Sequence, residues 1–120
     1  MKSFQVKPLS SLQGELSLPG DKSIAHRCLI LSAIAKGKTI IENFPASLDC
    51  LYTLKVFKQL GIKIKKEKDR LNKINVFGKG LKGLNKPKGE IFLGNSGTTL
   101  RLLLGVLAGQ NFRVNLTLKF

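Results

Sequence analysis

The feature that most constrains this chain is the change from alternating residues to a long apolar run within residues 18–27, which read Leu-Pro-Gly-Asp-Lys-Ser-Ile-Ala-His-Arg. Residues 15–18 alternate as a β-strand does, and the Pro-Gly pair ends that strand. The stretch from Ile24 to Ala35 is almost wholly apolar, which predicts a helix buried nearly all round. Its polar residues are His26, Arg27 and Ser32. We therefore expect a strand, a tight turn and a helix capped by Ser23.

The start of this expected helix has the residues of an anion-binding site. The first turn of a helix exposes unpaired N–H groups and a partial positive charge, which stabilise a phosphate or a carboxylate. Lys22 adds a full charge beside that turn, and Arg27 follows Ser23 by one helical turn on the same face. Taken singly, Ser23 and Lys22 also fit a structural interpretation as a helix cap and a solvated cation. Arg27 would then pair with a carboxylate such as Asp21 or Asp49.

A second strand, Gly-rich turn and apolar helix follow near the end of the chain. The expected strand, turn and helix are residues 90–93, 94–99 and 100–108. Asn95 supplies a cap oxygen, and Gly97 permits a tight backbone with exposed N–H groups. Arg101 follows Gly97 by four residues, as Arg27 follows Ser23. Two such helix starts suggest a site for two anionic groups or two anionic substrates. An ordinary capped helix with a structural Arg101 is the alternative.

The remaining pattern predicts a mixed α/β fold. Apolar residues recur every three or four positions after Ser47, which marks an amphipathic helix packed on a sheet. Glycines at 37, 61 and 109 are placed to end the three helices. The other expected elements are strands at 4–7, 15–18, 38–44, 62–66, 72–77 and 112–118, a helix from Ser47 to about Leu60, a charged turn at 67–70 and a loop at 78–89. We expect two buried helices and the amphipathic one on a largely mixed sheet.

Positive charge dominates the composition. The chain has 17 Lys and 4 Arg against seven acidic residues, a formal net charge of +14. This excess points to an anionic partner, which can be a nucleic acid, a membrane surface or a small polyanionic metabolite. The lysines of residues 79–88 favour nucleic acid, but one Tyr and no Trp argue against stacking on bases. The lysines at 63, 65, 66 and 68 are most simply the solvated face of a hairpin.

The cysteines and the apolar segments bear on metal binding and on cellular location. Cys28 and Cys50 are isolated and His26 is the single histidine, so we expect no metal-ligand cluster. Cys28 itself is expected to be a small buried hydrophobe. The first residues lack the apolar run of a signal peptide, and no stretch is long enough to cross a bilayer. We expect a cytoplasmic protein, and its oligomeric state stays open.

Residues 18–27 and 92–101 resemble the two N-terminal motifs of the EPSP synthase family, the 3-phosphoshikimate 1-carboxyvinyltransferases. The second motif reads Phe-Leu-Gly-Asn-Ser-Gly-Thr-Thr-Leu-Arg. Both motifs stand in the family's order, separated by its βαβαββ repeat unit. The UDP-N-acetylglucosamine enolpyruvyl transferases are a more distant alternative, because their first motif pairs Lys with Asn. The resemblance implies an incomplete copy of the family's inside-out α/β barrel.

The resemblance implies transfer of the enolpyruvyl group of phosphoenolpyruvate to the 5-hydroxyl of shikimate 3-phosphate, in the shikimate pathway to aromatic amino acids. It implies no metal and no organic cofactor. Lys22 would contact both substrates, and Ser23 and Arg27 would bind shikimate 3-phosphate. Gly97 would line the phosphoenolpyruvate pocket. The implied substrate-binding set is completed by Asn95 and Arg101, whose roles are less defined.

The resemblance covers residues 4–117 and implies a division of the chain. Residues 1–20 would be strands of the hinge and second-domain region, and residues 21–120 the first part of the N-terminal globular domain. The catalytic acids and bases of the family lie outside the matched part. We therefore expect a truncated N-terminal portion that carries part of the site, holds no catalytic residue and is inactive alone. A small basic nucleic-acid-binding domain and a non-catalytic anion-binding remnant stay open as alternatives.

Overall fold

A computed structural model describes residues 2–67 and 70–119 of the chain. These residues form the predicted mixed α/β fold, with helices and strands interleaved along the sequence. In chain order the elements are α1 (Lys22–Ile34), β1 (Lys36–Ile41), α2 (Leu48–Gln59), β2 (Lys63–Glu67), β3 (Arg70–Lys79), β4 (Ile91–Phe92), α3 (Gly97–Ala108) and β5 (Leu116–Thr117). None of the described helices is long and apolar enough to span a membrane.

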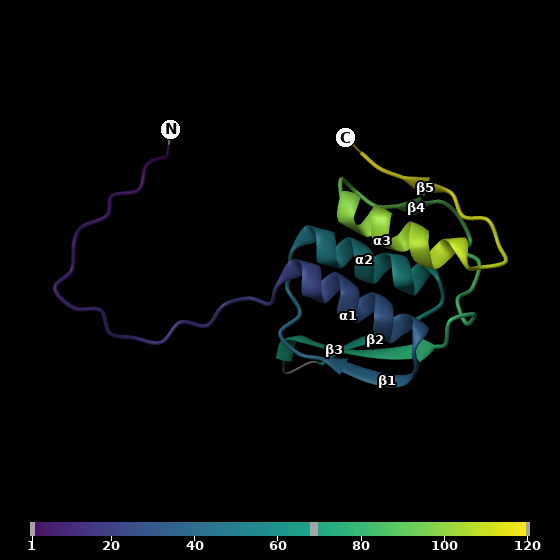
Figure 1. Cartoon of the computed structure of the whole chain (residues 1–120), viewed down its shortest axis with the longest axis horizontal. Coiled ribbons are helices and arrows are strands. Elements are labelled where there is room, and N and C mark those ends of the chain that lie inside the picture. The colour runs from purple at the N-terminus through teal and green to yellow at the C-terminus, as the bar shows by residue number, and fades with distance from the viewer. Residues whose placement is uncertain (1, 68–69, 120) are drawn as a thin grey trace.

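The three helices lie side by side and run in the same direction, so their N-termini meet at one end of the molecule (Figure 1). α2 lies between α1 and α3 and packs against both. α1 also packs on β1 and β3, which cover one side of the helix layer. Leu29 of α1 and Val56 and Phe57 of α2 are completely buried in the core between these elements.

The larger sheet is antiparallel, with the strand order β1-β3-β2. The predicted hairpin is confirmed as β2 and β3, where Ile64 pairs with Val76. Ile64, Ile74 and Val76 are buried, as the apolar side of a sheet covered by helices should be. The predicted turn at 67–70 includes residues 68 and 69, which lie outside the described residues.

The other side of this sheet is charged and exposed. Lys63, Lys65 and Lys66 are exposed, which confirms the solvated face predicted for them, and Lys68 lies outside the described residues. The ammonium groups of Lys63 and Lys38 lie 5.4 and 6.0 Å from the centre of the Phe77 ring. Cation–π attraction of this kind holds the lysines close to the sheet.

A second, smaller sheet replaces part of the single mixed sheet that the sequence predicts. β4 and β5 pair in parallel, Ile91 with Leu116 and Phe92 with Thr117. The predicted strands at 90–93 and 112–118 therefore exist but are shorter. α2 lies between the two sheets and packs on β2 and on β4, which explains why they stay separate.

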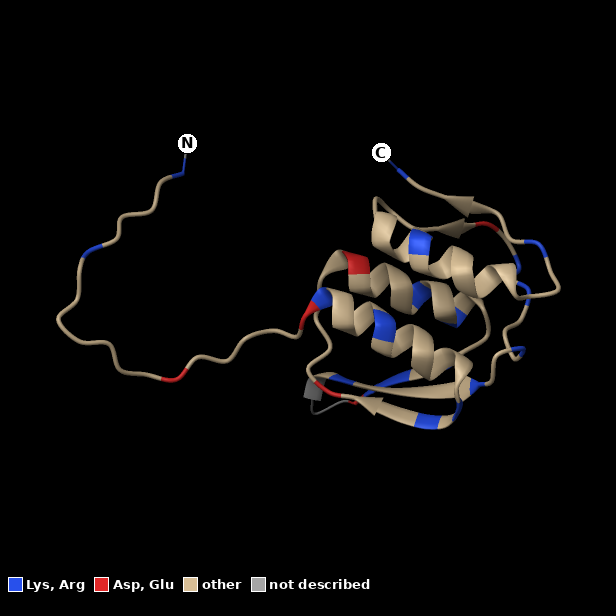
Figure 2. Ribbon diagram, viewed as in Figure 1, with Lys and Arg blue, Asp and Glu red and all other residues tan. Residues whose placement is uncertain are grey.

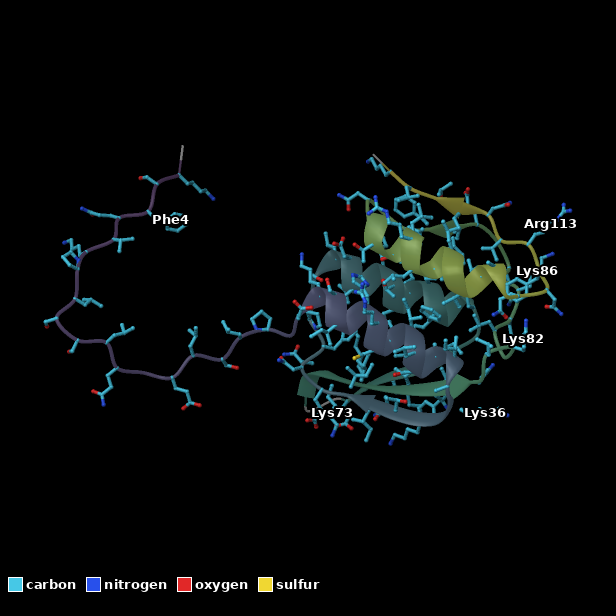
Figure 3. All side chains as sticks on the ribbon, viewed as in Figure 1. Phe4, Lys36, Lys73, Lys82, Lys86 and Arg113 are labelled. Carbon is cyan, nitrogen blue, oxygen red and sulfur yellow. The ribbon has the colours of Figure 1, made fainter. Side chains whose placement is uncertain are left out.

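The strands predicted at residues 4–7 and 15–18 are not formed. Residues 2–20 make an extended arm that leads away from the body of the molecule (Figure 1). Phe4 lies far out on this arm and is 97% exposed (Figure 3). Two short strands are marginal by themselves and need further strands or a helix to cover their apolar side. The described residues provide no such cover.

The expected burial of α1 on nearly all sides is wrong. Ile24 and Leu31 are each 63% exposed, and Cys28, expected to be buried, is partly exposed. α3 is also half covered, since Leu103 is buried while Leu104 is exposed. The two helices flank α2, and each leaves an outward face uncovered, although α1 also packs on β1 and β3. α2, predicted to be amphipathic, is the central helix.

Helix ends match the sequence-based prediction in part. Ser47 is the N-cap of α2 and Gly109 the C-cap of α3, as predicted. α3 begins at Gly97 and not at Leu100. α1 ends at Ile34 with Ala35 as its C-cap, so Gly37 is not the cap. Gly37 instead lies in β1 at a φ of +100°, which glycine adopts without strain.

Gly78 of β3 lies against the end of α1, where a Cβ would collide with the carbonyl oxygens of Ser32 and Ala35. We expect Gly78→Ala to lower the free energy of unfolding by about 1–3 kcal/mol, because the strand or the helix end must move. Urea denaturation measures this loss. Gly89→Ala is the matched control, since a Cβ at Gly89 meets no atom within 4 Å. Equal stability of the two variants would contradict the close packing.

Candidate anion-binding site

The first motif forms the N-terminal turn of α1. Asp21, and not Ser23, is the N-cap: its Oδ1 accepts the Ile24 N–H at 2.8 Å. Asp and Ser are equally good caps, so the prediction of Ser23 missed the boundary by two residues. Because Asp21 takes the capping role, Lys22 and Ser23 become the first two helical residues, and both are exposed.

Arg27 folds back along α1 toward this turn. Its Nη1 donates to the Ser23 carbonyl oxygen at 2.9 Å, which places the guanidinium beside the first turn of the helix. The predicted shared face of Arg27 and Ser23 is therefore observed. Within the described residues no carboxylate lies at ion-pair distance from Arg27, so the alternative pairing with Asp21 or Asp49 is not formed. The guanidinium is exposed and available to an anion.

Gly20 sets the path by which the chain enters α1. A Cβ at Gly20 would collide with the Asn43 carbonyl oxygen, so only glycine permits this approach. Asn43 has a φ of +56°, and its Nδ2 donates to the Leu18 carbonyl at 3.4 Å. The glycine of the motif is thus explained by close packing on the loop after β1.

The second motif forms the turn between β4 and α3. Gly94 has a φ of +60°, and the Tyr52 ring occupies the space that a Cβ would need. Ser96 is the N-cap of α3, and its Oγ accepts the Thr99 N–H at 3.3 Å. Asn95 and Arg101 are exposed and Gly97 is partly exposed, so the predicted residues lie at the surface around the helix start. A shallow hollow of about 300 Å³ opens beside the turn. Its lining residues are Leu48, Tyr52, Phe92, Gly94, Asn95 and Lys119.

A buried polar network joins the two motifs through α2. His26 Nδ1 lies 2.8 Å from Thr53 Oγ1, which lies 2.8 Å from Thr99 Oγ1. Thr99 Oγ1 lies 2.6 Å from Ser96 Oγ. All four residues are at most 3% exposed. We call His26, Thr53, Thr99 and Ser96 the hydroxyl–imidazole network.

The network holds three helix N-termini together at one end of the molecule. Further evidence is Cys50, the third residue of α2, whose Sγ lies 3.9 Å from the carbonyl oxygen of Lys22, the first residue of α1. Parallel helix dipoles place three partial positive charges at this end. Lys22, Arg27 and Arg101 add full charges, which makes this end attractive to anions. Asp21, the N-cap of α1, and Asp49 in the first turn of α2 offset part of this charge.

His26 is kept neutral at physiological pH. Its pKa lies below the ordinary value of 6.5, mainly because burial removes the imidazole from water. Asp49 raises this pKa, whereas the charges of Arg27 and Lys22 lower it further. His26 Nε2 faces Cys50 Sγ at 4.0 Å, a weak acceptor for a second ring proton. His26 therefore serves as a structural hydrogen-bonding group and is a poor acid or base for a ligand at the surface.

The sequence predicts the positions of the exposed residues at the two helix starts but does not single out Thr53. Thr53 occupies a core position of α2, between Cys50 and Leu54 on the buried side of the helix. A polar residue on an apolar helix face is the signal that could have identified it, and His26 on α1 gives the same signal. Their pairing spans 27 residues of sequence, so no local pattern predicts it.

The chain matches known proteins over most of its length. A family model of EPSP synthase (3-phosphoshikimate 1-carboxyvinyltransferase) matches residues 6–117. The 3-phosphoshikimate 1-carboxyvinyltransferase of Lactiplantibacillus plantarum is 45% identical over 116 residues, which are 97% of this chain and 26% of that protein. The enzyme of the same name from Oenococcus oeni is 49% identical over 112 residues, which are 93% of this chain and 25% of that protein.

Solved structures give the same result. The structure of EPSP synthase from Acinetobacter baumannii superposes with a TM-score of 0.82 at 38% sequence identity. The match covers 88% of this chain and 23% of that chain. The chain thus spans about a quarter of the length of the curated relatives that it matches.

The lowered pKa of His26 predicts acid destabilisation. The unfolded chain binds the His26 proton more tightly than the folded chain, so the stabilising effect is complete above about pH 6.5 and is lost as the pH falls below it. We expect the free energy of unfolding to fall between pH 7.5 and 5.5 in the parent protein. His26→Asn should be less stable at pH 7.5 but show a flatter pH dependence, measured by urea denaturation at each pH. Parallel pH profiles for the two proteins would show that His26 does not titrate in this way.

Proposed function

Because this chain belongs to the EPSP synthase family, we propose that it provides one wall of the site that transfers the enolpyruvyl group of phosphoenolpyruvate to the 5-hydroxyl of shikimate 3-phosphate. The observation that carries the proposal is the joining of two cationic helix starts by the hydroxyl–imidazole network. Both substrates carry a phosphate and a carboxylate. Two neighbouring anion-binding turns are what such a pair requires.

The proposed roles follow from where the side chains lie. Lys22 at the first helical position of α1 contacts both substrates, and Ser23 and Arg27 bind shikimate 3-phosphate. Gly97 opens α3 without a Cβ, which leaves room for phosphoenolpyruvate close to the backbone N–H groups. Asn95 and Arg101 complete the substrate-binding set at the second turn.

The chain binds and orients substrates in this proposal but does not supply the proton transfers. Enolpyruvyl transfer needs a proton donor for the methylene carbon and a base for the attacking hydroxyl. His26 is buried and neutral, and the Asp21 carboxylate is engaged as a helix cap. The proposed catalytic acid and base come from outside these 120 residues, and we propose that the chain is inactive alone. The site needs no metal or organic cofactor, and the reaction takes place in the cytoplasm.

We also propose a division of the chain at the start of α1. Residues 1–20 belong to a hinge and second-domain region, and residues 21–120 form the first part of a globular domain. The exposed apolar side chains support this division. Val6 and Leu16 on the arm are 89% and 81% exposed, which suits strands that pair elsewhere. Ile24, Leu31 and Leu104 on the outer faces of α1 and α3 suit burial against further helices.

The alternative function, a nucleic-acid-binding domain, has less support. Basic residues are spread over the helices, the sheet and the loops and do not form one stripe (Figure 2). Lys82, Lys86 and Arg113 gather at the end where the helices finish (Figure 3). Lys82 Nζ donates to the carbonyl of Gly109, the C-cap of α3, and Lys58 lies in the last turn of α2. Cations at helix C-termini stabilise the helix dipoles, so these lysines have a structural use.

Titration of the 120-residue chain with shikimate 3-phosphate and with an oligonucleotide distinguishes substrate binding from nucleic-acid binding. We expect shikimate 3-phosphate to bind and to perturb the NMR signals of Lys22, Ser23 and Arg27, with a modest dependence on salt. An oligonucleotide should bind weakly, and its binding should fall steeply with salt by counterion release.

Lys22→Met should weaken shikimate 3-phosphate binding about tenfold or more, because a charge-assisted hydrogen bond contributes roughly 1.5–3 kcal/mol. Lys65→Met, exposed on the distant sheet face, is the matched control. Equal effects of the two variants would reject the assigned site.

Gly97→Ala tests the second turn without disturbing the fold. A Cβ at Gly97 meets no atom within 4 Å, and Gly97 is helical, so we expect stability to stay the same or rise by up to about 1 kcal/mol. Phosphoenolpyruvate binding should weaken, and shikimate 3-phosphate binding should change less, as measured by NMR titration. Gly94→Ala is the contrasting variant, because the Tyr52 ring and a positive φ forbid a side chain there, and it should lose stability. Equal loss of both ligands in Gly97→Ala would indicate a folding defect.

A further inference from the structure

Thr53 is the one member of the hydroxyl–imidazole network that belongs to neither motif. It lies in the first half of α2, is completely buried, and touches both flanking helices through one oxygen atom. Thr53 Oγ1 lies 2.8 Å from His26 Nδ1 of α1 and 2.8 Å from Thr99 Oγ1 of α3. It also donates to the Asp49 carbonyl at 3.2 Å.

These three contacts use the full hydrogen-bonding capacity of the hydroxyl. A threonine hydroxyl has one donor and two acceptor sites. If Thr53 donates to the Asp49 carbonyl, it accepts from His26 Nδ1–H and from the Thr99 hydroxyl. Ser96 then donates to Thr99 Oγ1 and accepts the Thr99 N–H. Every hydroxyl of the network is satisfied in this arrangement, which fixes the direction of each bond.

Thr53 Oγ1 lies between the two helix starts that carry the predicted anion-binding residues. His26 precedes Arg27 on α1, and Thr99 lies in the first turn of α3, two residues after Gly97. α1 and α3 lie on opposite sides of α2 (Figure 1). The bonds through Thr53 are therefore a direct connection between the two anion-binding turns.

We propose that Thr53 is a positioning residue that fixes the first turn of α3 relative to α1, and so sets the spacing between the two anion-binding turns. A valine has nearly the same shape and would fill the same space in the core, so packing alone does not require a hydroxyl here. The hydroxyl restricts the relative orientation of the helices that it joins, because hydrogen bonds weaken steeply when their angles change. The consequence for substrates rests on the proposed function, whereas the coupling of the two turns does not.

The coupling is tested without any ligand. The ring-nitrogen NMR signals of His26 are followed through its titration in the parent chain, Thr99→Val, Thr53→Val and the double variant. The groups that act on the His26 ring are Asp49, Cys50, Lys22, Arg27 and Thr53, and Thr99→Val replaces none of them. We expect Thr99→Val to shift the midpoint when Thr53 is present and to have no effect in the Thr53→Val background. An identical shift in both backgrounds, or no shift in either, overturns the proposal.

The effect on the site is tested by titrating the 120-residue chain with shikimate 3-phosphate. We expect Thr53→Val to weaken binding about tenfold, on the scale of one lost hydrogen bond, and Thr53→Ser to restore it. Val56→Ala, a buried residue of the same helix outside the network, is the matched control. It should destabilise the fold by leaving a cavity yet change affinity by no more than about twofold.

The outcomes distinguish a failure of the Thr53 positioning role from a failure of the proposed function. Equal weakening by Thr53→Val and Val56→Ala, at equal loss of stability, shows that Thr53 is merely structural and overturns its positioning role. Absence of shikimate 3-phosphate binding in the parent chain contradicts the proposed function, and the His26 titration still decides whether Thr53 couples the turns. If Thr53→Val does not fold, Thr99→Val alone decides the coupling, because an unchanged His26 midpoint in that variant overturns the proposal.

Discussion

The arrangement of this chain depends on one run of buried hydrogen bonds, from the His26 imidazole through the hydroxyls of Thr53 and Thr99 to Ser96. Polar groups in a core are costly unless every donor and acceptor is paired. Pairing is possible here only if three helices place particular turns side by side. The network therefore restricts how α1, α2 and α3 can pack, whereas apolar contacts among leucines and valines would allow the helices to slide. Residues far apart in sequence are brought to one end of the molecule by this restriction.

Parallel packing of three helices gives the two ends of the layer opposite electrostatic characters. At the C-terminal end the partial negative charges meet cations, since Lys82 binds the Gly109 carbonyl and Lys58 lies in the last turn of α2. At the N-terminal end the partial positive charges meet further cations, Lys22, Arg27 and Arg101, with Asp21 and Asp49 as partial offsets. Within the described residues these two carboxylates leave an excess of positive charge at the N-terminal end. The same helix direction that is neutralised at one end thus leaves a positive potential at the other.

Local hydrophobic periodicity in the sequence predicted most of the helices and strands. The features that it did not predict depend on contacts between residues far apart in the sequence. The apolar period after Ser47 and the alternation in β2 and β3 were sufficient for the helix and the hairpin. Asp21 and Ser23 are both good caps, so composition could not decide between them. The residues on the arm alternate as strands do, but a strand also needs a partner, which the described residues do not offer. The position of the exposed residues at the two helix starts could be predicted because helix starts have a local signature. The contacts of Thr53 could not, since its partners are 27 and 46 residues away.

Substitutions at the exposed charged residues and at the buried network residues should have different effects. Lys22, Arg27 and Arg101 lie at the surface, so changes there alter charge with little effect on the fold. The network residues lie in the core, and a change there leaves buried partners without hydrogen bonds. Under the proposed function, single surface residues would set ligand preference, whereas the spacing between the two turns would change only through the buried network. The geometry of the two turns is set by core packing and buried hydrogen bonds, which form here without an anion.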